Sequence, residues 1–252
     1  MLWVRGRLST MERLSIASFL HHGHPVRLFS YEDVADLPAG ALLENAAHIV
    51  PEKEIFTNPG AIGHGGLSIF ANFFRYRLLL ARGGIWAECD LVCIKPFGFA
   101  QTMAHFFGSE RMINPSDASV NPAVWIQNCI IQAPPGSPII ARALRIAEQA
   151  DLLNGPWGST GPRAVHAAVE ELNAMNFVMS PDVFCPFGWW QVPEFITPAI
   201  RLIPETAHAI HLYNEIWRRN FIDKDARYDP LSLYERLKRQ YLGTGSPHDR
   251  NS

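Results

Sequence analysis

Residues 83 to 97 read Gly-Gly-Ile-Trp-Ala-Glu-Cys-Asp-Leu-Val-Cys-Ile-Lys-Pro-Phe, and they determine more of the fold than any other stretch. Two apolar, strand-like runs flank a pair of acids, Glu88 and Asp90. On an extended chain, residues two apart point to the same side, so both carboxylates can bind one divalent cation. Cys89, between them, points back towards the core. The alternative interpretation is that the two acids simply end a strand at the surface.

The preceding residues, Ile69 to Arg82, read as a helix that is apolar over most of its circumference, and Gly83 suits the left-handed conformation at its end. Asn72 and Arg75 stand three residues apart and therefore share one face of this helix. Because so apolar a helix is mostly buried, the guanidinium of Arg75 needs a partner. A bound phosphate or sugar would supply one, and so would a carboxylate of the protein itself.

The stretch from Asn72 to Asp90, Asn-Phe-Phe-Arg-Tyr-Arg-Leu-Leu-Leu-Ala-Arg-Gly-Gly-Ile-Trp-Ala-Glu-Cys-Asp, resembles the signature of sugar transferases with a DXD motif. The group that it most resembles is glycosyltransferase family 32, in its alpha-1,4-glycosyltransferase branch, which includes globotriaosylceramide synthase-like enzymes. The likeness covers nearly the whole chain, with further landmarks at residues 3–9, 157–162 and 211–214. The chain departs from the family pattern at two positions, where Asn72 and Glu88 replace acids that are aspartates in the family.

The resemblance implies one α/β domain over residues 1–242, of the GT-A type (Rossmann-like, binding a nucleotide sugar), with a mostly parallel central sheet. Residues 243–252 are polar and are expected to form a disordered tail. The β-α-β order of the first elements also indicates a mostly parallel sheet. The residue pattern predicts strands at 2–4, 25–31 and 124–133, a first helix capped by Ser9 with Glu12, helices at 138–150 and 163–172, and a last helix from 229–230 to 241.

The activity that the resemblance implies is metal-dependent, retaining transfer of a sugar from a nucleotide-diphosphate donor, above all a UDP-sugar, to a glycan or glycolipid hydroxyl. The expected cofactor is Mn²⁺ or Mg²⁺, and the implied metal ligands are Glu88, Asp90, His211 and Asn214. The implied catalytic residues are Asp90 and Arg75, the donor-binding residues are Asn72, Arg75, Trp86, Glu88, Asp90, Asn128, Trp3 and Gly6, and the acceptor-binding residues are Trp157, Thr160 and Gly161.

Several of these residues have purely structural alternatives. His211 could be a core histidine bonded to a carbonyl, and Asn128 could be a buried amide with partners inside the protein. Thr160 and Gly161 could start a helix that has Pro162 in its first turn. At the level of the whole chain, the changed acids leave a second hypothesis open, in which the fold is kept as a non-catalytic sugar- or nucleotide-binding module.

The composition excludes some classes of protein. Of the 252 residues 48% are hydrophobic and the formal net charge is -2, so we expect a packed core and no nucleic-acid partner. The four cysteines, Cys89, Cys93, Cys129 and Cys185, are too few and too scattered for a disulfide framework. Cys89 and Cys93 are expected to be reduced core residues rather than zinc ligands. With no apolar run of 18 residues and no signal-peptide pattern, we expect a cytoplasmic, bacterial-type enzyme whose contact with a membrane is at most peripheral.

Overall fold

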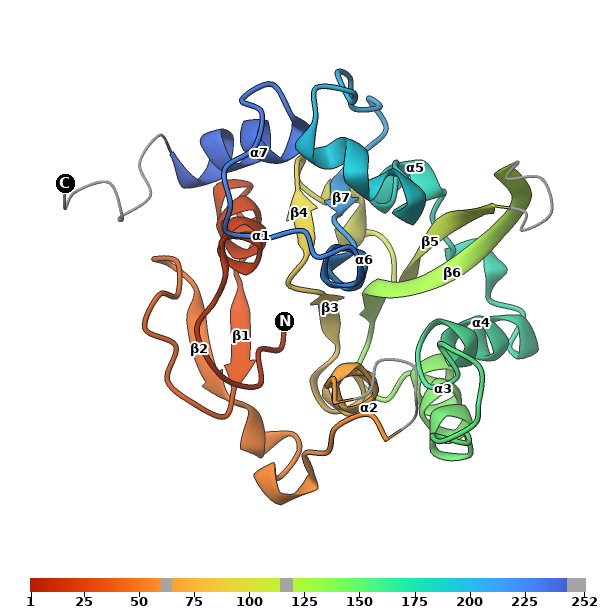
Figure 1. Cartoon of the computed structure of the whole chain (residues 1–252). Helices are drawn as coiled ribbons and strands as arrows, with labels where there is room; N and C mark the ends of the chain where they lie inside the picture. The colour runs from red at the N-terminus through yellow and green to blue at the C-terminus, as the bar shows by residue number, and fades with distance from the viewer. Residues whose placement is uncertain (60–64, 114–119, 244–252) are drawn as a thin grey trace.

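Paired strands run through the middle of the molecule, and helices lie around them (Figure 1). The computed structural model describes residues 1–59, 65–113 and 120–243, and the side chains of all of these except 120–123. The named strands are β1 (Arg27–Ser30), β2 (Leu42–Asn45), β3 (Gly84–Ala87), β4 (Leu91–Cys93), β5 (Phe106–Ile113), β6 (Val120–Ala133) and β7 (Ala209–His211). The α-helices are α1 (Thr10–His21), α2 (Ser68–Arg82), α3 (Pro138–Glu148), α4 (Pro162–Glu171), α5 (Pro181–Phe184), α6 (Asn214–Arg219) and α7 (Leu233–Leu242), and 3₁₀ turns lie at Ala46–His48, Glu52–Glu54, Gly98–Gln101, Met175–Phe177 and Trp189–Ile196.

The chain opens with the predicted β-α-β unit. Leu2 bridges to Phe29 of β1 in parallel, and α1 connects the two segments. Ser9 caps α1, because its hydroxyl accepts the amide of Met11 at 3.2 Å and its own amide donates to the carboxylate of Glu12 at 2.7 Å. The predicted capping box is therefore confirmed.

The other strand pairings correct the expectation of a mostly parallel central sheet. β1 and β2 are parallel, whereas β6 pairs antiparallel with both β3 and β5, and β7 pairs antiparallel with β4. Six residues separate the end of β5 from the start of β6, too few for the crossover that parallel neighbours need. β7 comes from the C-terminal part of the chain and joins β4 in the opposite direction. The described structure is thus a mixed α/β arrangement.

The last helix begins later than predicted, at Leu233 rather than at 229–230. Asp229 forms a turn instead, in which its carbonyl accepts the amide of Ser232 at 2.9 Å. The hydroxyl of Ser232 then accepts the amide of Glu235 at 3.3 Å and caps α7. The helix therefore starts after Ser232, the residue whose side chain caps it.

The last helix, α7, lies directly before the predicted domain boundary at residue 242. α7 ends at Leu242, and Gly243 follows in a left-handed conformation with φ of 78°. Of the predicted tail, 243–252, residues 244–252 lie outside the described residues. Within the described ranges, no helix combines the length and the apolar character that a membrane crossing requires.

Gly83, which ends α2 and leads into β3, has a φ of 64° and lies against Pro135. A Cβ at this position would come within 2.5 Å of the Pro135 Cδ atom and 2.7 Å of its backbone nitrogen. We therefore expect Gly83→Ala to lower the free energy of unfolding by about 3 kcal/mol, combining backbone strain with overpacking. Urea denaturation followed by circular dichroism measures this change.

Gly84→Ala is the matched control. Gly84 has a φ of 94°, but a Cβ there meets nothing within 4 Å, so its cost should be limited to backbone strain of about 1 kcal/mol. Equal losses in the two variants would contradict the role of Pro135 as a steric wall at the end of α2.

Candidate functional site

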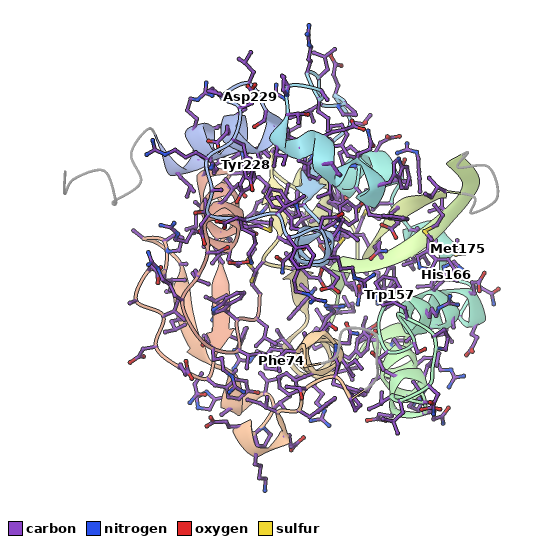
Figure 2. All side chains as sticks on the ribbon, viewed as in Figure 1. Phe74, Trp157, His166, Met175, Tyr228 and Asp229 are labelled. Carbon is purple, nitrogen blue, oxygen red and sulfur yellow. The ribbon has the colours of Figure 1, made fainter. Side chains whose placement is uncertain are left out.

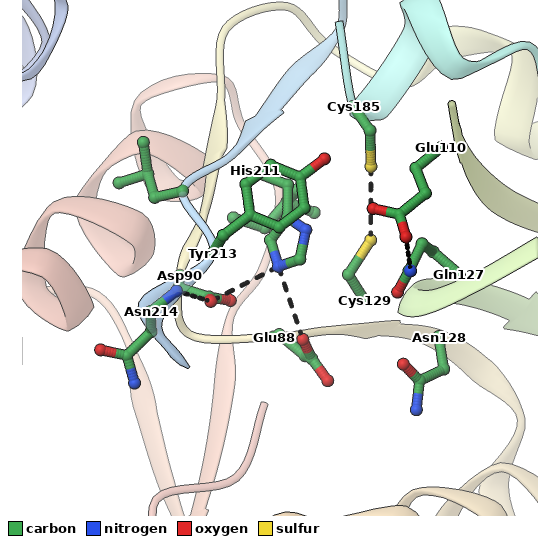
Figure 3. A network of polar contacts seen from close by, with 12 residues as sticks. Glu88, Asp90, Glu110, Gln127, Asn128, Cys129, Cys185, His211, Tyr213 and Asn214 are labelled. Carbon is green, nitrogen blue, oxygen red and sulfur yellow. Dashed lines mark hydrogen bonds and ion pairs between the residues drawn. The ribbon is translucent and has the colours of Figure 1, made fainter. Parts of the chain in front are cut away.

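The two acids of the sequence motif lie in the tight turn between β3 and β4, where they point towards His211 of β7 (Figure 3). The Nε2 atom of His211 is 3.4 Å from the Oδ2 atom of Asp90 and 3.7 Å from the Oε2 atom of Glu88. One ligand atom from each of the three residues lies within 4.8 Å of the other two. With side-chain exposures of 29% for Glu88 and 13% for Asp90, they are not two acids that end a strand at the open surface.

The backbone explains why His211 reaches this turn from so far along the chain. His211 is the register partner of Leu91, and the amide of Leu212 donates to the carbonyl of Asp90 at 2.9 Å. Asn214 adds its backbone N–H, which donates to the Asp90 Oδ2 atom at 2.8 Å. In Figure 3 the amide side chain of Asn214 points away from the other three residues. Asn214 thus holds Asp90 through its backbone, whereas the sequence predicted a metal ligand.

Tyr213 makes the corner between β7 and α6 and was missed by sequence reasoning. It has φ of 56° and ψ of 57°, a left-handed conformation that costs free energy for a residue other than glycine. Its hydroxyl donates to the carbonyl of Phe187 at 2.9 Å, and its ring lies 4.1 Å from the ring of His211, centroid to centroid. These contacts fix the imidazole beside the carboxylates. A tyrosine in a turn carries no sequence signal for this role.

Arg75 is buried beneath the acids, with 1% of its side chain exposed. Its Nη2 atom lies 2.6 Å from the Oε1 atom of Glu88, its Nη1 atom donates to the Asn72 Oδ1 atom at 3.1 Å, and its guanidinium lies 4.8 Å from the ring centre of Trp86. Of the two partners that the sequence left open, the structure has the protein carboxylate. Glu88 thereby uses one oxygen for Arg75 and turns the other towards His211.

A network of amides continues from Arg75 to the loop before α4. Asn128 of β6 donates to the Asn72 Oδ1 atom at 2.8 Å, and Asn72 donates to the hydroxyl of Thr160 at 3.0 Å. A Cβ on Gly161 would come within 2.8 Å of both amide nitrogens, so a larger residue there would displace the two side chains from this network. The residues predicted to bind the donor sugar, Asn72 and Asn128, therefore lie next to those predicted to bind the acceptor, Thr160 and Gly161.

The structural alternatives for these residues are partly borne out. Gly161 precedes α4, with Pro162 in the first turn of that helix, and Asn128 has a partner inside the protein. Tyr76, which sequence reasoning missed, donates its hydroxyl to the carbonyls of Thr160 at 2.9 Å and Gly161 at 3.2 Å. The signal for Tyr76 was available, because it lies four residues after Asn72 on the same helical face.

Trp157 and the pair Trp3 and Gly6 lie outside this network. Trp157 precedes α4 and is 53% exposed (Figure 2), and its carbonyl accepts the Nε atom of Arg163 at 2.9 Å. The indole of Trp3 donates a hydrogen bond to the carbonyl of Gly6 at 2.8 Å. The carbonyl of the preceding residue, Leu2, accepts a hydrogen bond from the Cys89 thiol at 3.4 Å. A cavity of about 430 Å³ lies beside Gly6; its lining residues are Gly6, Arg7, Asp33, Ala35 and Asp36.

Charge and burial shift the pKa values of the three residues at the turn. Burial lowers the pKa of His211, but the carboxylates of Asp90 and Glu88 outweigh it and raise the pKa to about 10. Burial also opposes ionisation of Asp90, yet His211 and the Asn214 amide hold the pKa of Asp90 below its usual range. For Glu88, burial raises the pKa more than Arg75 lowers it. The histidine is therefore protonated at neutral pH in the metal-free protein.

Three of the four predicted metal ligands suit a divalent cation. The Oδ1 atom of Asp90 is buried and has no hydrogen-bond partner in the described part of the chain. Two carboxylates and one imidazole form a donor set that accommodates Mn²⁺ or Mg²⁺, with the oxygens preferred by both ions. A cation between Glu88, Asp90 and His211 would give the orphaned oxygen a partner and would require His211 to lose its proton.

On the side of His211 away from Glu88 and Asp90 lies a second group of polar residues, which sequence reasoning did not connect with His211 (Figure 3). Glu110 of β5 is buried and accepts a hydrogen bond from Gln127 of β6, and burial raises its pKa to about 7. Cys129, two residues further along β6, faces Cys185 with a sulfur-to-sulfur distance of 3.9 Å. The alternation along β6 does indicate that Gln127 and Cys129 share one face, opposite to Asn128.

Comparisons with known proteins leave the family open. No protein-family model matches the chain, and no curated protein matches it. Among solved structures, the chain is similar to one described as "PaToxG Glycosyltransferase", with 14% sequence identity and a TM-score of 0.44 over 100% of this chain and 79% of that chain. A likeness at this level does not establish a fold or an activity. Membership of glycosyltransferase family 32, and of its alpha-1,4 branch, stays a prediction.

Proposed function

We propose that the protein is a glycosyltransferase of the GT-A type, which uses Mn²⁺ or Mg²⁺ to move a sugar from a nucleoside-diphosphate donor to a hydroxyl of a glycan or glycolipid. The observation that carries this proposal is the convergence of Glu88, Asp90 and His211 within 4.8 Å, with a buried carboxylate oxygen left without a partner among the described residues. A UDP-sugar donor and retention of configuration belong to the same proposal and rest on the sequence resemblance.

The hard step in such a transfer is departure of the anionic diphosphate. A bound divalent cation would offset the negative charge of that leaving group. The role of Arg75 follows from its burial: it holds the Glu88 Oε1 atom at 2.6 Å and leaves Oε2 on the side of His211. We therefore assign Arg75 as a positioning residue that acts through Glu88, in place of the catalytic contact that the sequence suggested. Asp90 is held in turn by the backbone of Asn214.

The amide network would form the wall beside the donor sugar. The side-chain oxygen of Asn72 accepts hydrogen bonds from Arg75 and Asn128, and its nitrogen donates one to Thr160. These bonds keep the three polar side chains in fixed orientations next to the acids, which is what selective binding of sugar hydroxyls requires. Trp157, being half-exposed, offers an indole face for an acceptor sugar.

Binding of Mn²⁺ should release about one proton from the protein at neutral pH, because His211 must become neutral to act as a ligand. Its pKa of about 10 means that the proton is present below that pH. Apparent affinity for Mn²⁺ should therefore rise about tenfold per pH unit between about pH 6 and pH 8. Calorimetry in buffers of different ionisation enthalpy counts the released protons, and an affinity independent of pH would contradict this coupling.

Titration calorimetry of UDP into the full-length protein, with and without Mn²⁺, tests the proposed donor site. We expect binding that depends on the cation, followed by hydrolysis or transfer when UDP-sugars replace UDP. Absence of cation-dependent binding for UDP and GDP alike would contradict the proposal.

A non-catalytic binding module is the second candidate, favoured by the replacement of two family acids by Asn72 and Glu88. The double variant Asn72→Asp/Glu88→Asp separates the two. An aspartate at 72 keeps an oxygen for Arg75 and Asn128, and its second oxygen can accept the hydroxyl of Thr160. The fold should therefore tolerate it. An active transferase should keep or gain turnover in this variant, whereas a binding module should stay inactive although it binds the nucleotide.

A further inference from the structure

Two buried thiols lie on the far side of His211 from Glu88 and Asp90 (Figure 3). Cys129 comes from β6 and Cys185 directly follows α5, with exposures of 0% and 2%. Their sulfur atoms are 3.9 Å apart, and one ligand atom from each of Cys129, Cys185 and His211 lies within 4.8 Å of the others. Residues far apart in the sequence thus form a compact set of two sulfurs and one imidazole.

The imidazole of His211 has an unused nitrogen on this side. Its Nε2 atom faces the two carboxylates, whereas Nδ1 is buried and has no hydrogen-bond partner within the described ranges. Figure 3 shows Nδ1 pointing to the side where Cys129 and Cys185 lie. Buried polar atoms are nearly always bonded to something, so an orphaned ring nitrogen beside two thiols calls for a ligand.

We propose that Cys129, Cys185 and the Nδ1 atom of His211 bind a thiophilic divalent cation, with zinc as the best match. Two thiolates bound to tetrahedral zinc at about 2.3 Å stand about 3.8 Å apart. The observed sulfur-to-sulfur distance of 3.9 Å needs almost no adjustment. Three protein ligands leave the fourth position of the ion to water or another small ligand.

Charge balance also favours zinc at this buried position. Binding breaks two S–H bonds and the Nδ1–H bond of the protonated His211, and it forms two Zn–S bonds and one Zn–N bond. The three protons leave for solvent, and no oxidant is involved. Two thiolates cancel the charge of Zn²⁺, so the bound group is neutral overall. A neutral group is far less costly to bury than a lone charge. The site shares His211 with the carboxylate site but uses neither Glu88 nor Asp90, so the proposed transferase activity is not needed for it.

Titration of the full-length, reduced and chelator-stripped protein with Co²⁺ tests the site, because cobalt bound to thiolate gives a charge-transfer band in the near ultraviolet. We expect this band in the wild type, whether Co²⁺ is added to folded protein or present during refolding, and we expect zinc to displace the cobalt. Cys129→Ser and Cys185→Ser should each lose the band and weaken zinc binding by more than about 100-fold, since loss of outer contacts alone costs 10–100-fold.

Two matched variants serve as controls. Cys93→Ser changes another buried cysteine of the same apolar cluster, and Asp90→Asn removes an oxygen ligand of the carboxylate site; both should keep the thiolate band. Cobalt that binds the wild type without a thiolate band would overturn the proposal, because only the carboxylate site would then be filled. No uptake of cobalt, or a disulfide between Cys129 and Cys185 under reducing conditions, would overturn it as well.

Discussion

Asp90→Asn should abolish the Mn²⁺-dependent binding of UDP, with affinity for Mn²⁺ falling by at least about 100-fold. Asp90 contributes the carboxylate nearest to His211, at 3.4 Å, and carries the oxygen that has no partner among the described residues. The amide loses the charge and one of the two acceptor oxygens at nearly unchanged size. Calorimetry with Mn²⁺ alone, and then with UDP in the presence of Mn²⁺, measures both effects.

The substitution should leave the fold in place, because the remaining oxygen of an asparagine can still accept the backbone amide of Asn214. Asp182→Asn is a suitable control, since Asp182 pairs with Arg111 and its side chain is 38% exposed. Unchanged Mn²⁺-dependent binding of UDP in Asp90→Asn would remove the acids from the donor site and, with them, the central observation of the proposed function.

Arg75→Met should lower the free energy of unfolding by about 3 kcal/mol, the lower end of what removing one partner of a buried ion pair costs. Arg75 is 1% exposed and Glu88 is 29% exposed, so water can solvate part of the Glu88 carboxylate once Arg75 is removed, and this limits the loss of stability. For a chain of this length the melting temperature should fall by about 6–12 °C. Affinity for Mn²⁺ should fall as well, by about 10–100-fold, because Glu88 is no longer held in position.

Arg77→Met provides the comparison on the same helix. Arg77 pairs with Glu54 at 2.6 Å, but both side chains are about 40% exposed, and exposed pairs contribute at most about 1 kcal/mol. Unfolding in urea and Mn²⁺ calorimetry should therefore separate the two variants clearly. A loss of stability in Arg75→Met with unchanged affinity for Mn²⁺ would show that Arg75 supports the fold and does not position Glu88.

The parts of the fold that follow from neighbouring residues were predictable from sequence. The cap at Ser9, the shared face of Asn72 and Arg75 and the turn at Gly83 depend on spacing over a few residues. The convergence of Glu88 and Asp90 follows in the same way, from the period of an extended chain. His211 was added by resemblance rather than by local pattern, and the structure brings it to the acids.

The parts that could not be predicted depend on contacts between distant segments. Neither strand carries a sequence signal for the direction in which β7 joins β4, so the prediction of a mostly parallel sheet was wrong. Cys129 and Cys185 are separated by 56 residues and become neighbours only through the packing of α5 against β5. The late start of α7 shows the reverse case, since the cap at Ser232 is a local signal that was overlooked.

The pairing of β7 with β4 has a consequence for how the protein responds to its ligands. The carboxylates come from residues 88–90 and the imidazole from residue 211, so a cation held by all three closes a loop of more than a hundred residues. Such an ion acts as a removable cross-link: it binds the folded arrangement only, and so it resists detachment of the last strand. Undocking of the C-terminal segment and loss of the cation are then one thermodynamic event, and cellular metal supply would set how often that segment opens.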